Sequence, residues 1–225
     1  MTATPGADPA LYESDPVFVE QFNAWVRDEV DADCAVLTPR VRQLVRLASV
    51  VGANGTPRFE VLADGALDAV LTPVELKELV YQAVPWVGYA TVSDVLRATN
   101  DLLRRRGVQL PLPEQAGTPA EPPAAAATTG DTAHLDRYVT GYLHRDVLGR
   151  GGLDAADRAL VTVALLVGLG AEPAQLEEQL GDAVDAGHDR AVLLGVLTAL
   201  VPAVGLARVR AAVTVLDAVL PAAAP

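Results

Sequence analysis

The chain has 225 residues, of which 51% are hydrophobic and only 4% aromatic, and its formal net charge is −12. A core of alanine, valine and leucine suits closely packed helices better than a β-sandwich, and this length allows two small domains. The acidic balance argues against nucleic acid and against an anionic membrane surface, because both need basic clusters and the longest one here is residues 104–106.

The first part of the chain predicts a series of helices. A capping side chain followed by proline, at residues 15–16 and again at 38–39, predicts helices that run to about residue 29 and about residue 51. In the second of these helices, apolar residues recur at helical spacing on one face. Residues 59–69 are predicted to form the next helix, with Leu62 on its buried side.

The clearest local signal is the Thr-Pro-Val-Glu sequence that begins at Thr72. The side chain of Thr72 can accept a hydrogen bond from the backbone of Glu75, and Glu75 can reach back to Thr72, which is a capping box. We expect this helix to end near Pro85, followed by an apolar loop over residues 86–90 and a last helix over 91–106.

Residues 108–132 contain five prolines and a run of four alanines, which predicts an extended linker. Beyond it, helices are predicted at residues 135–148, 155–168, 173–186, 190–200 and 208–220. Residues 191–207 carry no charge, but Pro202 and Gly205 interrupt them, which favours a buried helix and loop over a membrane span. The predicted fold is all-α, built from antiparallel helical hairpins.

Residues 37–92 recur as residues 153–209 with one single-residue gap, so the chain is predicted to be a fused dimer of one helical unit. The matched pairs include Arg42 with Arg158, Gly52 with Gly168, Pro85 with Pro202 and Gly88 with Gly205. The predicted divisions are an N-terminal tail (1–14), a first repeat (15–107), the linker (108–132), a second repeat (133–221) and a C-terminal tail (222–225).

The two halves share a pattern with a known family. The segments LTPRVRQLVRLASVVG and GALDAVLTPVELKELVYQAVPWVGYA in the first half, and LGRGGLDAADRALVTVALLVGLG in the second, resemble the carboxymuconolactone decarboxylase family, which includes the alkylhydroperoxidase D branch. The resemblance implies a helical bundle and a small-molecule substrate, with no cofactor. Short members of the family form hexameric rings, so a chain with two copies implies a homotrimer.

The family's functional positions are altered here. Its glutamate after the first helix's arginine corresponds to Gln43 in the first half, and its histidine on the second helix corresponds to Leu62. The loop that usually starts with tyrosine contains Trp86 and Tyr89. The peroxidase branch needs a Cys-x-x-Cys pair. Cys34 is the single cysteine, which excludes that activity and any disulfide within the chain and fits a cytoplasmic protein.

From these positions we expect a pocket in the first half. The predicted catalytic residues are Arg42, Gln43 and Tyr89, and the predicted substrate-binding residues are Arg42, Leu62, Gln82, Trp86 and Tyr89. Two amides, an indole and a phenol suit a planar, oxygen-rich small molecule. The spacing of the histidines predicts no metal site.

A structural interpretation stands beside each of these assignments. Trp86 and Tyr89 could fill an interface between the repeats, and Arg42 and Arg158 could pair with acids such as Asp157, Asp64 or Glu78.

Two functions follow from the sequence. The first is a non-redox lyase or isomerase that acts on a small lactone, aromatic acid or polyketide-like acid. The second is a catalytically inactive member that binds a ligand or serves as an oligomeric scaffold. A cavity near Trp86 that contains a titratable group would favour the enzyme.

Overall fold

The computed structural model describes residues 9–113, 131 and 133–222, and the elements that it defines there are helical. The first half contains α1 (Pro9–Ser14), α2 (Pro16–Trp25), the π-helix η1 (Val26–Val30), α3 (Asp31–Asp33), α4 (Pro39–Gly52), α5 (Thr56–Ala69) and α6 (Pro73–Arg105). The second half contains α7 (Ala133–Arg137), the π-helix η3 (Tyr138–Leu148), α8 (Ala155–Leu169), α9 (Pro173–Asp185), α10 (Arg190–Val204) and α11 (Leu206–Val219). The predicted all-α fold is confirmed.

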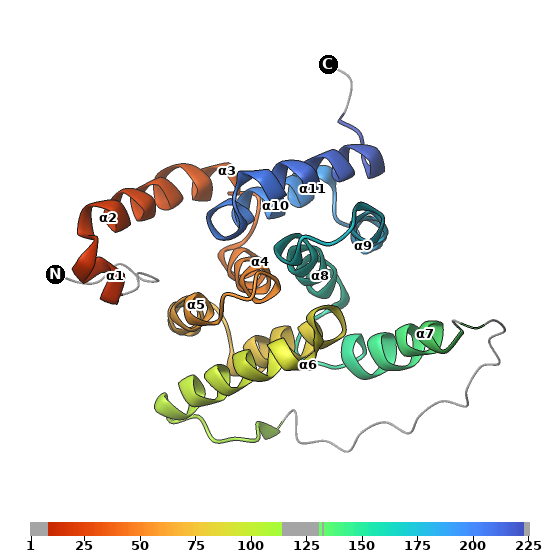
Figure 1. The fold of residues 1–225 in the computed structure, drawn as a ribbon, viewed down its shortest axis with the longest axis horizontal. Coiled ribbons are helices and arrows are strands. Elements are labelled where there is room, and N and C mark those ends of the chain that lie inside the picture. The colour runs from red at the N-terminus through yellow and green to blue at the C-terminus, as the bar shows by residue number, and fades with distance from the viewer. Residues whose placement is uncertain (1–8, 114–130, 132, 223–225) are drawn as a thin grey trace.

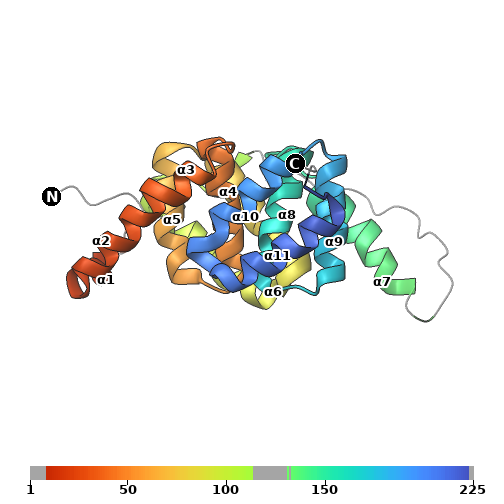
Figure 2. The same cartoon turned by 90° about the horizontal axis from the view of Figure 1, so that it is seen from above.

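Helices α4 and α8 lie side by side at the centre of the molecule (Figure 1). Helix α6 lies on one side of this pair, and α10 and α11 cover the other side, while α5 and α9 lie outside the pair. Helices α1 and α2 extend from one end of the molecule and α7 lies at the other (Figure 2). The buried core is mainly leucine, valine and alanine from these helices, as the composition predicts.

The two central helices approach each other closely at a pair of glycines. A Cβ atom on Gly52 would lie 2.2 Å from the backbone oxygen of Leu165, and one on Gly168 would lie 2.2 Å from the backbone oxygen of Ser49. These contacts are reciprocal under the offset of the predicted repeat, because Ser49 corresponds to Leu165 as Gly52 corresponds to Gly168. Neither position has space for a side chain.

The predicted interruption of this helix is confirmed, but it lies at Gly88 and not at Pro85. Two helical segments, one passing through Pro85 and one running to Arg105, meet at a kink at Gly88, which lies in the predicted loop and has non-helical dihedral angles (φ 81°, ψ 153°). Proline removes one backbone hydrogen bond and bends a helix, but it does not have to end it. Gly88 then makes the turn with a positive φ that other residues rarely adopt. Gly205, between α10 and α11, has nearly the same angles (φ 82°, ψ 159°).

Other local predictions have mixed outcomes. Thr38 caps α4 by accepting a hydrogen bond from the backbone of Val41, as predicted, whereas Asp15 makes no side-chain capping bond at α2. Residues 9–14 of the predicted N-terminal tail form α1. Most of the predicted linker, residues 114–130 and 132, lies outside the described residues. In the part of the chain that the structure covers, no helix combines the length and apolar character needed to cross a membrane.

The glycine contact predicts a large loss of stability for Gly52→Ala. The added methyl group must displace the backbone of α8, so we expect a loss of about 3 kcal/mol in the free energy of unfolding, measured by urea denaturation.

Gly181→Ala in α9 is the matched control, because a Cβ atom there meets nothing within 4 Å. It should raise stability by about 0.5–1 kcal/mol. Equal stabilities for the two variants would contradict the close packing of α4 against α8.

Candidate functional site

A cavity of about 560 Å³ opens between α2 and η1, α4 and α5, and the end of α10. Its apolar lining includes Phe22, Val26, Leu62, Ala199, Pro202 and Ala203, and its polar lining is Asn23, Arg27, Asp31, Gln43, Arg46 and Arg58. A mainly apolar hollow with a few polar groups is typical of small-molecule sites. The lining comes from both halves of the chain.

An ion pair lies at the wall of this cavity. The buried Arg46 donates from Nη2 to Asp31 Oδ1 at 2.6 Å and from Nε to the carbonyl oxygen of Ala199 at 3.2 Å. Arg42, one helical turn earlier on α4, donates to the Asp31 carbonyl oxygen at 3.1 Å, and its Nε lies 3.8 Å from Asp31 Oδ1. Two guanidinium groups therefore fix the backbone and the carboxylate of Asp31.

The structure does not gather the six predicted site residues in one cavity. Gln43 and Leu62 line the cavity, and Arg42 contacts it through Asp31. Gln82, Trp86 and Tyr89 are absent from its lining. The physical reason is that the Gln82 side chain on α6 bonds to α8, whereas Ala199 on α10 accepts a hydrogen bond from Arg46 of α4.

At the cavity, residues of α10 from the second half therefore lie beside α4, while Gln82 of α6 from the first half lies beside α8. Under the predicted repeat offset, Ala199 corresponds to Gln82 and Ala203 corresponds to Trp86. The positions that we expected beside Gln43 are therefore filled from the second half, by alanines. Small side chains at these two positions leave room for the cavity.

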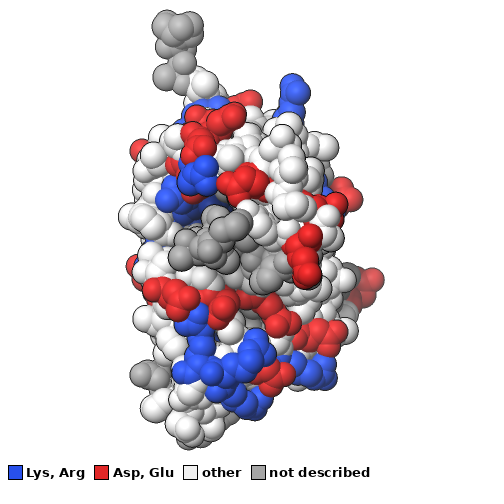
Figure 3. All heavy atoms as spheres, turned by 90° about the vertical axis from the view of Figure 1, so that its left-hand side faces the viewer, with Lys and Arg blue, Asp and Glu red and all other residues white. Residues whose placement is uncertain are grey.

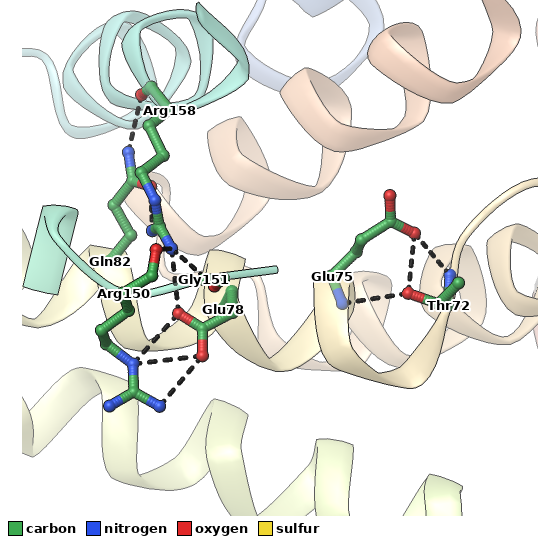
Figure 4. Close-up of polar contacts among 7 residues, drawn as sticks. All are labelled: Thr72, Glu75, Glu78, Gln82, Arg150, Gly151 and Arg158. Atoms are coloured by element: carbon green, nitrogen blue, oxygen red, sulfur yellow. Dashed lines mark hydrogen bonds and ion pairs between the residues drawn. The ribbon is translucent and has the colours of Figure 1, made fainter. Parts of the chain in front are cut away.

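Gln82 belongs to a buried polar cluster (Figure 4). Its amide nitrogen donates to the carbonyl oxygen of Arg158 at 2.7 Å and to Thr162 Oγ1 at 2.8 Å, while Arg158 Nη1 donates to Gln82 Oε1 at 3.1 Å. The buried carboxylate of Glu78 accepts from Arg158 at 3.1 Å and from Arg150 at 3.0 Å. The structural interpretation of Arg158, as the partner of a nearby acid, is confirmed.

Trp86 and Tyr89 have different environments. Trp86 is half-buried and packs against the core, and its Nε1 is buried without a hydrogen-bond partner among the described residues. Tyr89 is 68% exposed. The indole therefore contributes packing, and the phenol faces solvent.

The capping box at Thr72 is confirmed and also connects the two halves. Thr72 donates from its backbone to Glu75 Oε2 at 2.7 Å and accepts from the Glu75 backbone at 3.2 Å. Arg40 bridges Glu75 Oε1 at 2.5 Å and Asp157 Oδ2 at 2.6 Å. Burial alone would raise the pKa of Glu75, but the hydrogen bonds from Thr72 and Arg40 lower it overall. This carboxylate is therefore a structural anchor between α4, α6 and α8.

Charged side chains gather on the end of the molecule formed by α2, α5 and the end of α6 (Figure 3). The arginine run predicted as the largest basic cluster lies at this end of α6, where Arg106 donates to Asp64 and Asp68, each at 2.7 Å. Arg104 pairs with Asp101 at 2.8 Å. Much of this positive charge is therefore compensated. Within the described residues, no group of three or more His, Cys, Asp or Glu side chains is placed to hold a metal ion.

Neither Asp31 nor Arg46 is among the site residues predicted from the sequence. Arg46 had a detectable signal, because it interrupts a run of apolar residues in α4 and is buried there. Asp31 had no such signal in the sequence. It lies in an acidic stretch, residues 28–33, whose composition is the same as that of a solvent-exposed helix face.

Comparison with known proteins identifies the second half of the chain. Residues 133–218, from α7 into α11, match the family model described as "Carboxymuconolactone decarboxylase family". A search of curated proteins found no match to the chain. The matched range does not include the first half, so the duplication remains a prediction.

The buried Glu78 cluster makes a testable prediction about stability. Glu78→Ala leaves the nearly inaccessible Arg158 without its carboxylate partner, so we expect a loss of about 3–5 kcal/mol in urea denaturation.

Glu60→Ala removes an exposed pair with Arg105 at 3.7 Å and should cost less than about 1 kcal/mol. Replacing both Glu78 and Arg158 by methionine should recover part of the loss, because no buried charge is left unpaired and Arg150, the other partner of Glu78, is partly exposed. A mild effect of Glu78→Ala, similar to that of Glu60→Ala, would show that the cluster contributes little.

Proposed function

Because residues 133–218 belong to the carboxymuconolactone decarboxylase family, we propose that this chain is a non-redox enzyme, a lyase or isomerase, acting on a small lactone, aromatic acid or polyketide-like acid. The observation that carries the proposal is the cavity between α2, α4, α5 and α10, which holds an arginine, a carboxylate and an amide on apolar walls. Its volume is within the range of small-molecule sites.

The cavity has polar groups that a ligand could use. Asn23 has a buried amide nitrogen with no hydrogen-bond partner in the described part of the chain. Arg46 uses Nε and Nη2 for its contacts, which leaves Nη1 for a ligand carboxylate or carbonyl oxygen. Gln43 lines the same cavity and can donate or accept. A substrate with a carboxylate at one end and an apolar or aromatic body matches this arrangement.

A second candidate function is supported by Gln43. An amide cannot exchange a proton as the glutamate of the resembled family can, so an inactive family member that binds its ligand without converting it also fits the cavity. Turnover of a bound lactone distinguishes the two candidates.

We also propose that the chain forms a homotrimer, as the family resemblance implies. Val17 and Phe18 on α2 are each 70% exposed, and Tyr138 and Tyr142 on η3 are also exposed. Helix α2 and helix α7, which directly precedes η3, lie at opposite ends of the molecule (Figure 2), which suits a ring in which each end contacts the next copy.

The ligand proposal predicts thermal stabilisation by small acids. With salicylate or muconolactone at about 100 times Kd, the unfolding temperature of the wild type should rise by roughly 5–10 °C. Methyl salicylate, which lacks the carboxylate, should produce a smaller rise.

Two matched variants locate the site. Ala203→Trp adds an indole to the cavity lining, at the position that corresponds to Trp86 of the first half under the predicted repeat, and should abolish the rise. Trp86→Ala leaves the cavity lining intact and should keep it. The opposite result would place the site at Trp86, and no rise with any of these compounds would remove the support for a ligand site.

The trimer proposal predicts a mass three times that of the chain in size-exclusion chromatography with light scattering. Phe18→Glu should yield a monomer, because a charge on α2 opposes apolar contact. Leu206→Glu, an exposed apolar position at the start of α11, is the control that should keep the trimer. A monomeric wild type would contradict the proposal.

A further inference from the structure

Asp31 is the one carboxylate among the described residues that line the cavity. The other charged lining residues are Arg27, Arg46 and Arg58, and arginine does not release its proton in proteins. Gln43 and Asn23 are amides and do not titrate. Any proton that a substrate gives up inside this cavity therefore has Asp31 as its acceptor, unless water takes it.

The chain holds Asp31 in a defined position. The segment before it is the π-helix η1, and the backbone N–H of Asp31 bonds to the carbonyl oxygen of Val26, five residues back. Such wider turns are frequent at functional sites, because they change which side chains share a helix face. Here the turn belongs to the segment whose residues Val26, Arg27 and Asp31 all line the cavity.

The two oxygens of the Asp31 carboxylate have different roles. Oδ1 accepts from Arg46 at 2.6 Å, while Oδ2 has no hydrogen-bond donor among the described residues. The side chain is 31% exposed although its partner Arg46 is only 10% exposed. One oxygen is thus anchored and the other is available to a molecule in the cavity.

Asp31, on α3, and Gln43, on α4, line the same cavity. Arg42 and Arg46, which both contact Asp31, are one helical turn apart, and Gln43 lies between them in sequence and lines the same cavity. A carboxylate from α3 therefore lines the same cavity as Gln43, the position where the resembled family has its glutamate and this chain has an amide. The cavity thus has a carboxylate, which comes from another segment.

We infer that Asp31 is the proton-transfer residue of this cavity, an inference that rests on the proposed function. With an unsaturated five-membered lactone, Oδ2 takes the proton from the ring carbon that carries the ring oxygen. That C–H bond breaks, an O–H bond forms on Asp31, and the electron pair moves through the ring to the carbonyl oxygen, which Arg46 and Gln43 stabilise by hydrogen bonds.

A proton then moves from Asp31 to the carbon next to the carbonyl, and in D₂O it is a deuteron, because the partly exposed carboxyl group exchanges with solvent before the transfer. The O–H bond of Asp31 breaks, a C–H bond forms, and the double bond has shifted by one position along the ring. The carboxylate is restored, and the reaction is an isomerisation that needs no oxidant, reductant or metal ion. Asp31 acts as base in the first half of the step and as acid in the second.

The experiment follows muconolactone, an unsaturated lactone with an acetate arm, by proton NMR in D₂O. We expect the wild type to isomerise it and to exchange its ring proton for deuterium. Asp31→Asn should retain binding, measured by the thermal shift, and reduce exchange by about 100-fold or more. Asp33→Asn, an exposed neighbour outside the cavity lining, is the matched control and should exchange like the wild type.

Chemical rescue separates proton transfer from a structural role. In Asp31→Ala, added formate or acetate should restore exchange, and acetate, the stronger base, should restore it faster at equal occupancy. A residue that only positions Arg46 would show no dependence on the basicity of the added acid. If Asp31→Asn unfolds or loses its ligand, the rescue of Asp31→Ala tests the role of Asp31 in its place.

The outcomes of the two proposals are distinct. A wild type that neither binds nor exchanges muconolactone or salicylate overturns the proposed function, and the role of Asp31 with it. A wild type that binds but does not exchange supports the inactive alternative and overturns the role of Asp31. Exchange that survives in Asp31→Asn with binding intact leaves the enzyme proposal standing and overturns the inference alone.

Discussion

The close approach of α4 and α8 is the contact on which the rest of the structure depends. Two glycines, Gly52 and Gly168, let the backbones of these helices touch, and the other helices pack around the pair. Because the central helices lie so near each other, α10 from the second half reaches α4 and α6 from the first half reaches α8. The separation of two backbones thus determines which side chains meet.

Polar contacts across the same interface fix the arrangement. Arg40 joins the cap of α6 to the start of α8, and Glu78 holds Arg158 below the surface. Buried charges of this kind add little stability compared with apolar residues of equal size, but they are costly when mispaired. They therefore favour one relative placement of the halves over others, and the cavity depends on that placement.

The sequence predicts local structure here better than it predicts the site. Helix starts marked by proline and a capping side chain occur where expected at Thr38 and Thr72, because those signals act within one turn. The sequence predicts the interruption of α6 at Pro85, but the helix accommodates the proline and is interrupted at Gly88, where φ is positive. Gln43 and Leu62 were placed in a cavity through the family resemblance. Asp31, Arg46 and Ala203 were missed, because their meeting depends on helices crossing between distant segments.

The part of the chain that matches a known family differs from the part that supplies the charged lining of the cavity. The segment that comparison recognises, residues 133–218, supplies only the end of α10 to the cavity, and every charged group in its lining comes from the first half. The half that matches a family model thus contributes only apolar side chains to the cavity. A gene fragment that encoded only residues 133–218 would match the family model without forming this cavity, because the cavity walls require both halves of the chain.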